Sequence, residues 1–466
     1  MPELTLPSTA RTPTPSSGTT LRLALAPGVY LARSPELAVL VRWPRSRSLG
    51  AWDEPTATLV EQLSDPRGVE VDAAVLTGHG TDDVLAGLLD DGWLTVTVER
   101  TSGHVMTVVP RRPPAARDVP AHRRRLTPSR HVVAVPTADG WSVEAPHSWG
   151  DVTFSDVTGM SRCLDPDGRE VDVLEQQVLA WCGVLVEPDA EAAELRHRQW
   201  SAHELWFHER SRRYGRERGF GGTFWARGTF APPPLRPPGA GVTVPFVTAD
   251  PQRWRERSSS LHTVLEDRRS TRRHDDDAPL TSERLGEFLY RTARLRAAQE
   301  VDGVEYASKP YPSGGSVYEI ELYLLVRHVE GIDPGLWVYD PTAHGLAPVR
   351  DGLADPDVAA LLREATHSST VDTPPQVTVL MAPRFGRILW KYEQMGYAVM
   401  LKHVGVLMQT MYLVATDMGL AACAIGSGDS DLFSRATGLD PLECTTVGEF
   451  LLGTPHPSDT FQERPA

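Results

Sequence analysis

Three arginine side chains are concentrated in the short segment DRRSTR, at Arg268, Arg269 and Arg272, with the hydroxyl group of Ser270 among them. Guanidinium groups form strong, paired hydrogen bonds with phosphate oxygens because the donors are charged and their geometry matches the acceptors. The segment therefore predicts a phosphate-binding turn just ahead of a helix. A solvated arginine-rich turn is the alternative.

Two further segments combine glycine with other small residues: PSGGS at residues 312–316 and AIGSGD at residues 424–429. Gly314 and Gly315 allow the backbone to approach a flat ligand, whose edge can accept hydrogen bonds from exposed N–H groups. A backbone N–H in the second segment could likewise reach a ring nitrogen of such a ligand and tune its electron affinity. Each segment alone is also compatible with an ordinary turn or loop.

The composition favours a globular protein with hydrophobic cores, since 41% of the 466 residues are hydrophobic. At roughly 150 residues per domain, this length predicts two to four domains. The net charge of −14 argues against broad contact with nucleic acid or anionic lipid. The four cysteines, Cys163, Cys182, Cys423 and Cys444, are widely spaced, so neither a zinc site nor a disulfide framework is expected.

Residues 1–20 lack a basic-then-apolar signal pattern and are predicted to be a disordered lead-in of a cytoplasmic protein. The most apolar segment, residues 397–420, is long enough to span a bilayer but contains Lys402, His403 and Asp417. Charged side chains at mid-membrane depth are costly, at about 2.5–3.5 kcal/mol each. We therefore expect a buried core helix and no membrane contact.

Two proline-rich segments, at residues 110–120 and 231–238, divide the chain, because proline removes a hydrogen-bond donor and disfavours helix in the preceding residue. Residues 21–110 resemble a winged-helix-like unit, and residues 121–199 form a second small α/β unit that loosely repeats its order. Such units can hold an extended peptide along a sheet edge, although a packing or dimerisation role is equally compatible. Residues 200–245 are predicted to be a connecting helix and a Pro-rich linker.

The connecting helix contains two histidines, His203 and His208, in the sequence HELWFH. Their spacing of five residues does not match the spacing of four that places two ligands on one helical face. A helix that buries its aromatic residues is the expected structure, and no metal site is predicted.

Residues 246–466 alternate helices and strands. Leu285, Phe288 and Leu289 follow at helical spacing, whereas residues 319–327 and 377–381 have the character of strands. Because the apolar faces of a sheet must be covered, we expect helices to flank it. The predicted class is α+β, with an antiparallel-rich sheet, flanking helices and small winged-helix-like units ahead of it.

The order of these segments resembles the nitroreductase superfamily, with its R-R-S-x-R opening, P-S-x-G, long apolar helix and glycine-containing loop. The closer similarity is to the SagB/ThcOx-type (McbC-like) dehydrogenases, over residues 200–457. It is carried by FHERSR (207–212), GGTF (221–224), WKYE (390–393), VGVLMQTMYL (404–413), GSGDSDL (426–432) and VGEFLLG (447–453). The resemblance implies a nitroreductase-like FMN domain over residues 246–466.

The resemblance also implies that FMN binds noncovalently at a homodimer interface. Its implied contacts to the phosphate and ribityl chain are Arg268, Ser270 and Arg272, with Arg269 as a weaker candidate. Its implied contacts to the isoalloxazine are Pro312, Ser313, Gly314 and Gly315, with Gln409 and the backbone of Ile425 and Gly426 as additional candidates. His403 is expected to be a core or supporting histidine.

Lys391 and Tyr392 match the catalytic pair proposed for these dehydrogenases. Oxidation of an azoline to an azole removes a proton from one carbon and a hydride from its neighbour, so a base is required. Lysine can serve only if burial or a nearby cation lowers its pKa. Without the resemblance, a surface lysine beside a packing tyrosine would be the simpler interpretation.

Three functions remain open from the sequence. The first is an azoline dehydrogenase that acts on a precursor peptide, with a cyclodehydratase complex as a possible partner. The second is another FMN-dependent reductase or desaturase, acting on a natural-product scaffold or a nitro compound. The third is a non-catalytic scaffold, which the presence of Lys391, Tyr392 and the arginine cluster disfavours.

Overall fold

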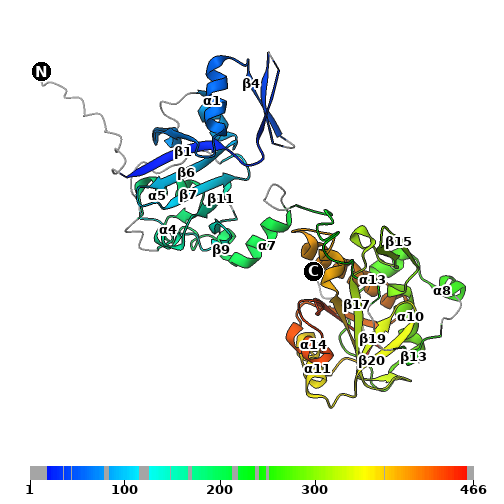
Figure 1. Cartoon of the computed structure of the whole chain (residues 1–466). Helices are drawn as coiled ribbons and strands as arrows, with labels where there is room; N and C mark the ends of the chain where they lie inside the picture. The colour runs from blue at the N-terminus through cyan, green and yellow to red at the C-terminus, as the bar shows by residue number, and fades with distance from the viewer. Residues whose placement is uncertain are drawn as a thin grey trace, which may run out of the picture. The chain divides into compact units, whose positions relative to one another are not determined.

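The computed structural model describes residues 18–34, 36–42, 45–77, 83–114, 125–146, 148–165, 171–212, 219–236, 241–247, 251–371 and 373–458. The chain divides into two compact units, Met1–Arg216 (unit 1) and Glu217–Ala466 (unit 2). Both are mixtures of helices and strands (Figure 1).

Unit 1 is built on a seven-stranded antiparallel sheet with the order β5-β1-β6-β7-β11-β10-β9. Its strands are β1 (Thr19–Leu25), β5 (Val69–Val71), β6 (Leu94–Arg100), β7 (Val105–Pro110), β9 (Val133–Thr137), β10 (Gly140–Glu144) and β11 (Gly150–Phe154). The sequence placed these strands in two successive units, whereas β7 pairs with β11 and joins them in one sheet. Similarity to winged-helix folds stays a prediction.

Smaller elements complete unit 1. Two additional sheets contain β2 (Tyr30–Arg33), β3 (Ala38–Arg42) and β4 (Arg45–Gly50), and β8 (Thr127–Pro128) with β12 (Leu185–Val186). The helices are α1 (Glu54–Ser64), α2 (Ala74–Thr77), α3 (Asp83–Asp90), α4 (Val157–Cys163), α5 (Val173–Trp181), α6 (Leu195–Arg198) and α7 (Ala202–Arg212). One apolar cluster, which includes Leu23, Trp93, Val108 and Leu179, runs through the unit, so its core is continuous.

Unit 2 contains a second seven-stranded sheet in which every neighbouring pair is antiparallel. Its order is β13 (Val244–Pro245), β20 (Gly345–Asp351), β19 (Gly335–Asp340), β17 (Ile320–Val326), β21 (Val377–Pro383), β23 (Gly448–Gly453) and β22 (Ala421–Ile425). All seven residues of β21 are buried, as expected for an interior strand covered on both faces. The predicted α+β class with an antiparallel sheet is confirmed.

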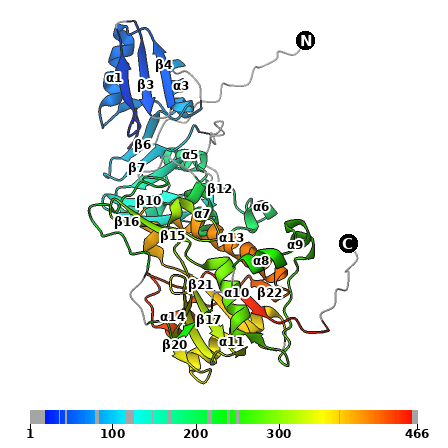
Figure 2. The ribbon, with the colours of Figure 1, turned by 90° about the vertical axis from the view of Figure 1, so that its right-hand side faces the viewer.

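Helices cover both faces of this sheet (Figures 1 and 2). Leu324 and Val379 pack against α10 (Ser282–Ala293) and α13 (Gly396–Asp417), whereas Leu325 packs against α11 (Pro356–Ser369) and α14 (Ser430–Thr437). The remaining elements are α8 (Pro251–Arg257), α9 (Leu261–Asp267), α12 (Phe385–Leu389), the 3-10 turn η1 (Gly314–Ser316), and the strand pairs β14 (Leu280–Thr281) with β18 (Val329–Glu330) and β15 (Ala297–Val301) with β16 (Val304–Ser308).

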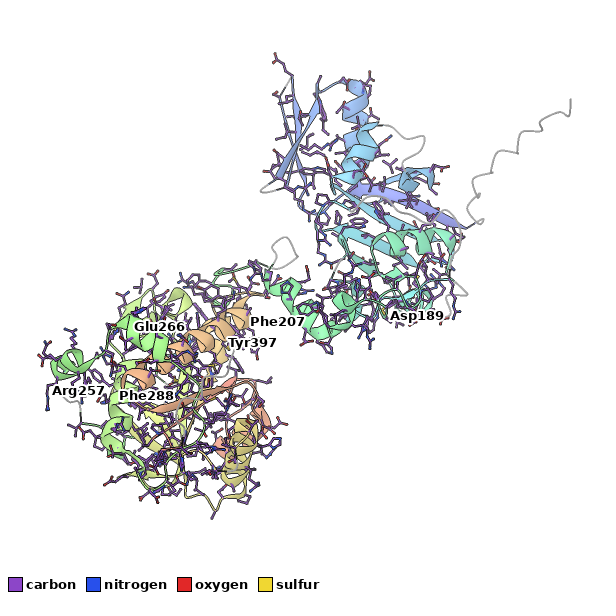
Figure 3. All side chains as sticks on the ribbon, turned by 180° about the vertical axis from the view of Figure 1, so that it is seen from behind. Asp189, Phe207, Arg257, Glu266, Phe288 and Tyr397 are labelled. Carbon is purple, nitrogen blue, oxygen red and sulfur yellow. The ribbon has the colours of Figure 1, made fainter. Side chains whose placement is uncertain are left out.

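Helix α13 differs in burial from the predicted core helix. By length and composition alone it could cross a membrane, with a mean hydropathy of 1.4, but only 33% of that window is buried in the protein. Its inner face, including Leu407 and Met411, packs in the core of unit 2. On its outer face Tyr397, labelled in Figure 3, and Leu401 are 41% and 39% exposed. The predicted core helix therefore packs in the core through one face only in the single chain.

Replacement of Phe450 by alanine tests the core of unit 2. This side chain is fully buried between Phe288 and Tyr412, with ring centroids 6.5 and 5.0 Å away. The cavity left by its removal is expected to lower the free energy of unfolding by about 3–5 kcal/mol. Denaturant titration measures this change. The control Leu442→Ala, at a residue that is 85% exposed, should stay within about 0.5 kcal/mol, and equal losses in both variants would contradict the assigned core.

Candidate functional site

The short helix α12 places Lys391 and Tyr392 at the edge of unit 2. The chain leaves the buried strand β21, turns through α12, and its last turn is continued by hydrogen bonds from Lys391 N and Tyr392 N to the Ile388 carbonyl, at 3.2 and 2.9 Å. Both side chains are half-buried. The helix therefore presents them side by side at a position that solvent still reaches.

The glycine segment PSGGS lies directly against this pair. A Cβ atom added at Gly315 would lie 2.5 Å from Lys391 Nζ and 2.7 Å from Tyr392 Oη, and the residue has φ of +64°. Only glycine tolerates both the left-handed backbone and this approach. The structure thus brings together two segments that were separate predictions, Gly315 with the Lys391–Tyr392 pair.

The GGTF segment forms the opposite wall. Gly221 and Glu393 form an isolated antiparallel bridge, and Phe224 N donates a 3.0 Å hydrogen bond to the Lys391 carbonyl. Thr223 Oγ1 donates to Glu393 Oε2 at 2.6 Å. Residues that were predicted to belong to a connecting linker are therefore part of the wall around Lys391.

Three aromatic rings surround the Lys391 amine. Its Nζ lies 4.9 Å from the ring centroid of Phe224, 5.5 Å from that of Tyr306 and 5.4 Å from that of Tyr392. Burial lowers the pKa of this amine and raises the pKa of the Tyr392 hydroxyl. The ring faces attract the charged amine, which opposes the effect of burial. Because burial favours the neutral form of the amine, this lysine is suited to act as a base.

A buried histidine supports the glycine segment from behind. Gly314 N donates a 2.6 Å hydrogen bond to His403 Nε2, and His403 Nδ1 lies 2.7 Å from Glu319 Oε1. Because Nε2 accepts, we infer that the proton is on Nδ1 and is donated to the carboxylate. Ser313 Oγ accepts from Tyr318 N at 3.1 Å, so its hydroxyl is also directed into this support.

The arginine segment is attached to a different part of α13. Ser270 Oγ lies 2.9 Å from the Tyr412 hydroxyl, which accepts a 2.7 Å hydrogen bond from Ala424 N. The guanidinium carbon of Arg268 lies 5.3 Å from the centroid of the Tyr412 ring. Ser270, Arg269 and Arg272 are exposed. The turn therefore combines an anchored hydroxyl with cationic side chains at the surface, as a phosphate site requires.

Helix α13 sets the distance between the glycine segment and the arginine segment. His403 supports the glycine segment, and Tyr412 supports Ser270 nine residues later, about 14 Å further along the helix axis. Gln409 is exposed between them. Because a helix is stiff, the arginine turn and the glycine segment are held at a fixed separation.

The third predicted segment follows β22. Ile425 is buried, and Gly426 is exposed. Behind the next residues, Glu449 accepts a 2.7 Å hydrogen bond from Thr446 Oγ1, and burial raises its pKa to about 7. Its carboxylate occupies the space that a Cβ atom at Gly428 would need. Gly428 is thus required for the loop to lie over Glu449.

Sequence reasoning missed several supporting residues. Glu319, Tyr306, Tyr412 and Glu449 were not singled out, although Tyr412 and Glu449 stand inside motifs that carry the resemblance. Glu319 opens a strand of apolar residues, and this buried-acid pattern was the available signal. For His403 the structure specifies the supporting role: it holds Gly314.

Part of unit 2 is similar to known proteins. Residues 265–450 match the family model described as the nitroreductase family. The chain is 29% identical over 167 residues to MJ1384, a protein described as a nitroreductase from Methanocaldococcus jannaschii, and the match covers 36% of this chain and 78% of that protein.

The second relative is McbC of Escherichia coli, a microcin B17-processing protein, with 32% identity over 117 residues, 24% of this chain and 42% of McbC. The match thus spans less than half of the length of McbC. Among solved structures, the E. coli microcin synthetase McbBCD complex with truncated pro-MccB17 bound gives a TM-score of 0.35 at 21% identity, covering 54% of this chain and 86% of that one.

The family match covers the strands and helices that carry Arg268, the glycine segment, Lys391 and Tyr412. Residues 265–450 of unit 2 are therefore similar to the nitroreductase family, and part of the chain is similar in sequence to McbC. The enzyme class that this similarity indicates is the oxidoreductases.

Proposed function

We propose that this chain is an FMN-dependent dehydrogenase that oxidises azoline rings of a precursor peptide to azoles. The observation that supports it most is the meeting of Lys391 Nζ and the Tyr392 hydroxyl beside Gly315, within a domain of the nitroreductase family. The reaction removes a proton next to a flat hydride acceptor, so it requires a base beside a loop that such an acceptor can approach closely.

The residues present fit FMN. Arg268, Arg272 and the anchored Ser270 offer cations and a hydroxyl to a phosphate and its ribityl chain. Because Gly314 and Gly315 have no Cβ atom, His403 and the Lys391–Tyr392 pair lie directly against this backbone. We propose that a flat ring binds beside the same short segment. When bound, FMN would supply the hydride acceptor of the reaction.

The side chains of this chain have separate tasks. Neutral Lys391 accepts the proton from the azoline carbon, and the rings of Phe224 and Tyr306 stabilise the ammonium that forms. Tyr392 orients the substrate through its hydroxyl, which stays protonated because burial raises its pKa. His403 keeps the Gly314 amide and its loop in place. The substrate is oxidised by loss of one proton and one hydride.

The partners of this reaction follow from the same resemblance. McbC is named for processing microcin B17, and by analogy we propose a peptide substrate, with a cyclodehydratase complex as a partner and the cytoplasm as the location. A second copy of the chain is proposed to cover the outer face of α13, where Tyr397, Leu401 and Val406 are 41%, 39% and 37% exposed. Unit 1 is proposed to hold the peptide along a sheet edge.

Purified protein is expected to contain FMN. Arg268→Ala combined with Arg272→Ala should lower the flavin content at least about tenfold, because two charge-assisted phosphate contacts of about 1.5–3 kcal/mol each are lost. Absorption spectra and mass spectrometry of the released cofactor measure this. Arg255→Ala, on exposed α8, is the control. Full flavin retention in the double variant would contradict the assigned phosphate site.

Lys391→Ala is expected to abolish conversion of an azoline peptide, seen as loss of two hydrogen atoms by mass spectrometry, while flavin remains bound. Because burial lowers the pKa of Lys391, the base is present above that pKa, and the wild-type rate should rise with pH through it and then level off. A rate that rises only above the ordinary pKa of tyrosine would assign the base to Tyr392 instead. If the protein acted only on nitro compounds, the proposed azoline substrate would be wrong.

His403→Phe is expected to lower kcat about 10–100-fold, by analogy with the loss of residues that orient a reacting group, because Gly314 N loses its acceptor. His403→Gln, which can still accept this hydrogen bond, should restore part of the rate. The flavin visible spectrum should shift in His403→Phe alone. Equal kcat and an unchanged spectrum in both variants would show that His403 only fills space.

A further inference from the structure

Three potential metal ligands meet in unit 1, far in the sequence from the site already described. The ligand atoms of His131, Glu191 and His197 all lie within 4.8 Å of one another. His131 is 1% exposed, and the two imidazole rings are stacked with centroids 6.0 Å apart. Among the residues that the structure describes, no other group of three such side chains comes as close.

Pairing of two short strands brings these ligands together. β8 pairs with β12, and Ser129 N donates to the Val184 carbonyl at 2.9 Å, which fixes the start of the segment that carries His131. The chain then turns back after β12 at Asp189, a residue with φ of +63° that is labelled in Figure 3, and enters α6, which carries His197. The cluster therefore joins two segments, the one after β8 and the one that runs from β12 into α6.

Glu191 is held in position by its own hydrogen bonds. Ser129 Oγ donates to Glu191 Oε1 at 2.7 Å, and Arg130 N donates to Oε2 at 2.8 Å. Each carboxylate oxygen has a second lone pair, so these bonds orient the group and leave it able to coordinate a cation. Such hydrogen bonds to a ligand are the usual support of a metal site.

We propose that His131, Glu191 and His197 bind one divalent transition-metal ion, with Zn²⁺ as the favoured ion. Two imidazoles with one carboxylate form a set that zinc accepts, with a fourth position left for water. In a tetrahedral site with bonds of 2.0–2.1 Å, ligand atoms lie about 3.4 Å apart. The cluster reaches this geometry by small side-chain rotations, since no ligand atom is further than 4.8 Å from another.

The ion neutralises charge and links chain segments at this end of unit 1. A carboxylate and two histidines packed side by side give a divalent cation an anionic and two neutral donors. Glu194, at the start of α6, adds a further negative charge near His197. The metal would join the loop after β8 to α6, just ahead of α7, and so stabilise the end of this unit.

Sequence reasoning did not predict this site. It considered the cysteines and the His203/His208 pair, whereas His131 and Glu191 stand sixty positions apart, and no spacing rule joins them. Only the β8–β12 pairing brings them together.

The test uses the full-length, untagged protein, stripped of metal by a chelator and dialysed against Zn²⁺ alone, followed by elemental analysis. One equivalent of zinc per chain is expected, and Co²⁺ in its place should give the visible bands of a tetrahedral site. His197→Ala and Glu191→Gln should each weaken Zn²⁺ binding at least about tenfold. Zn²⁺ should raise the unfolding temperature of the wild type and not of His197→Ala.

His203→Ala is the matched control, because this histidine is exposed on α7 and outside the cluster. It should bind zinc as the wild type does. Circular dichroism of His197→Ala confirms that its fold is kept. Absence of stoichiometric zinc from the wild type, equal binding by His197→Ala, or loss of binding in His203→Ala would each overturn the proposal. None of these outcomes depends on flavin or on turnover.

Discussion

The position of the Lys391–Tyr392 pair depends on one buried guanidinium group. Arg387, on α12, donates to the carbonyls of Val317, Pro233 and Glu305 at 2.7, 2.7 and 2.9 Å. These carbonyls belong to the segment after the glycine turn, the proline-rich segment and β16. Because a buried charge is costly unless all its donors are satisfied, α12 has one favourable position. Lys391 follows four residues later, so the same contacts place its amine.

Next to Arg387, two tryptophan side chains combine a polar N–H group with an aromatic ring. Trp225 Nε1 donates to the Leu389 carbonyl at 2.6 Å, and Trp390 Nε1 donates to the Phe230 carbonyl at 2.9 Å. The Trp390 ring packs edge-on against Phe224, whose ring faces the Lys391 amine. His403 and Glu319 are hydrogen-bonded behind the glycine segment. Desolvation of the amine and rigidity of the loop therefore have a common origin in packing, which links the stability of unit 2 to its chemistry.

Much of this arrangement could be predicted from the sequence, because local rules govern it. Alternation predicted β17, the apolar run at residues 377–381 predicted β21 as a buried strand, and helical spacing predicted α10. The Lys391–Tyr392 pair and Gly315 were found by motif, and the structure brings them together. Arg387, Tyr306 and Glu449 could not be found this way, because their roles come from contacts between segments 70 or more positions apart or from burial that only the sheet creates.

The course of residues 221–235 has a consequence for how such a protein can be divided. The family match begins at residue 265, yet Phe224 and the Pro233 carbonyl, both upstream of it, contact Lys391 and Arg387. A fragment cut at the start of the match would lose the Phe224 side of the Lys391 environment and one of the carbonyl acceptors of Arg387. Exchange of amino-terminal modules between relatives therefore has to keep residues 221–235 with the matched segment.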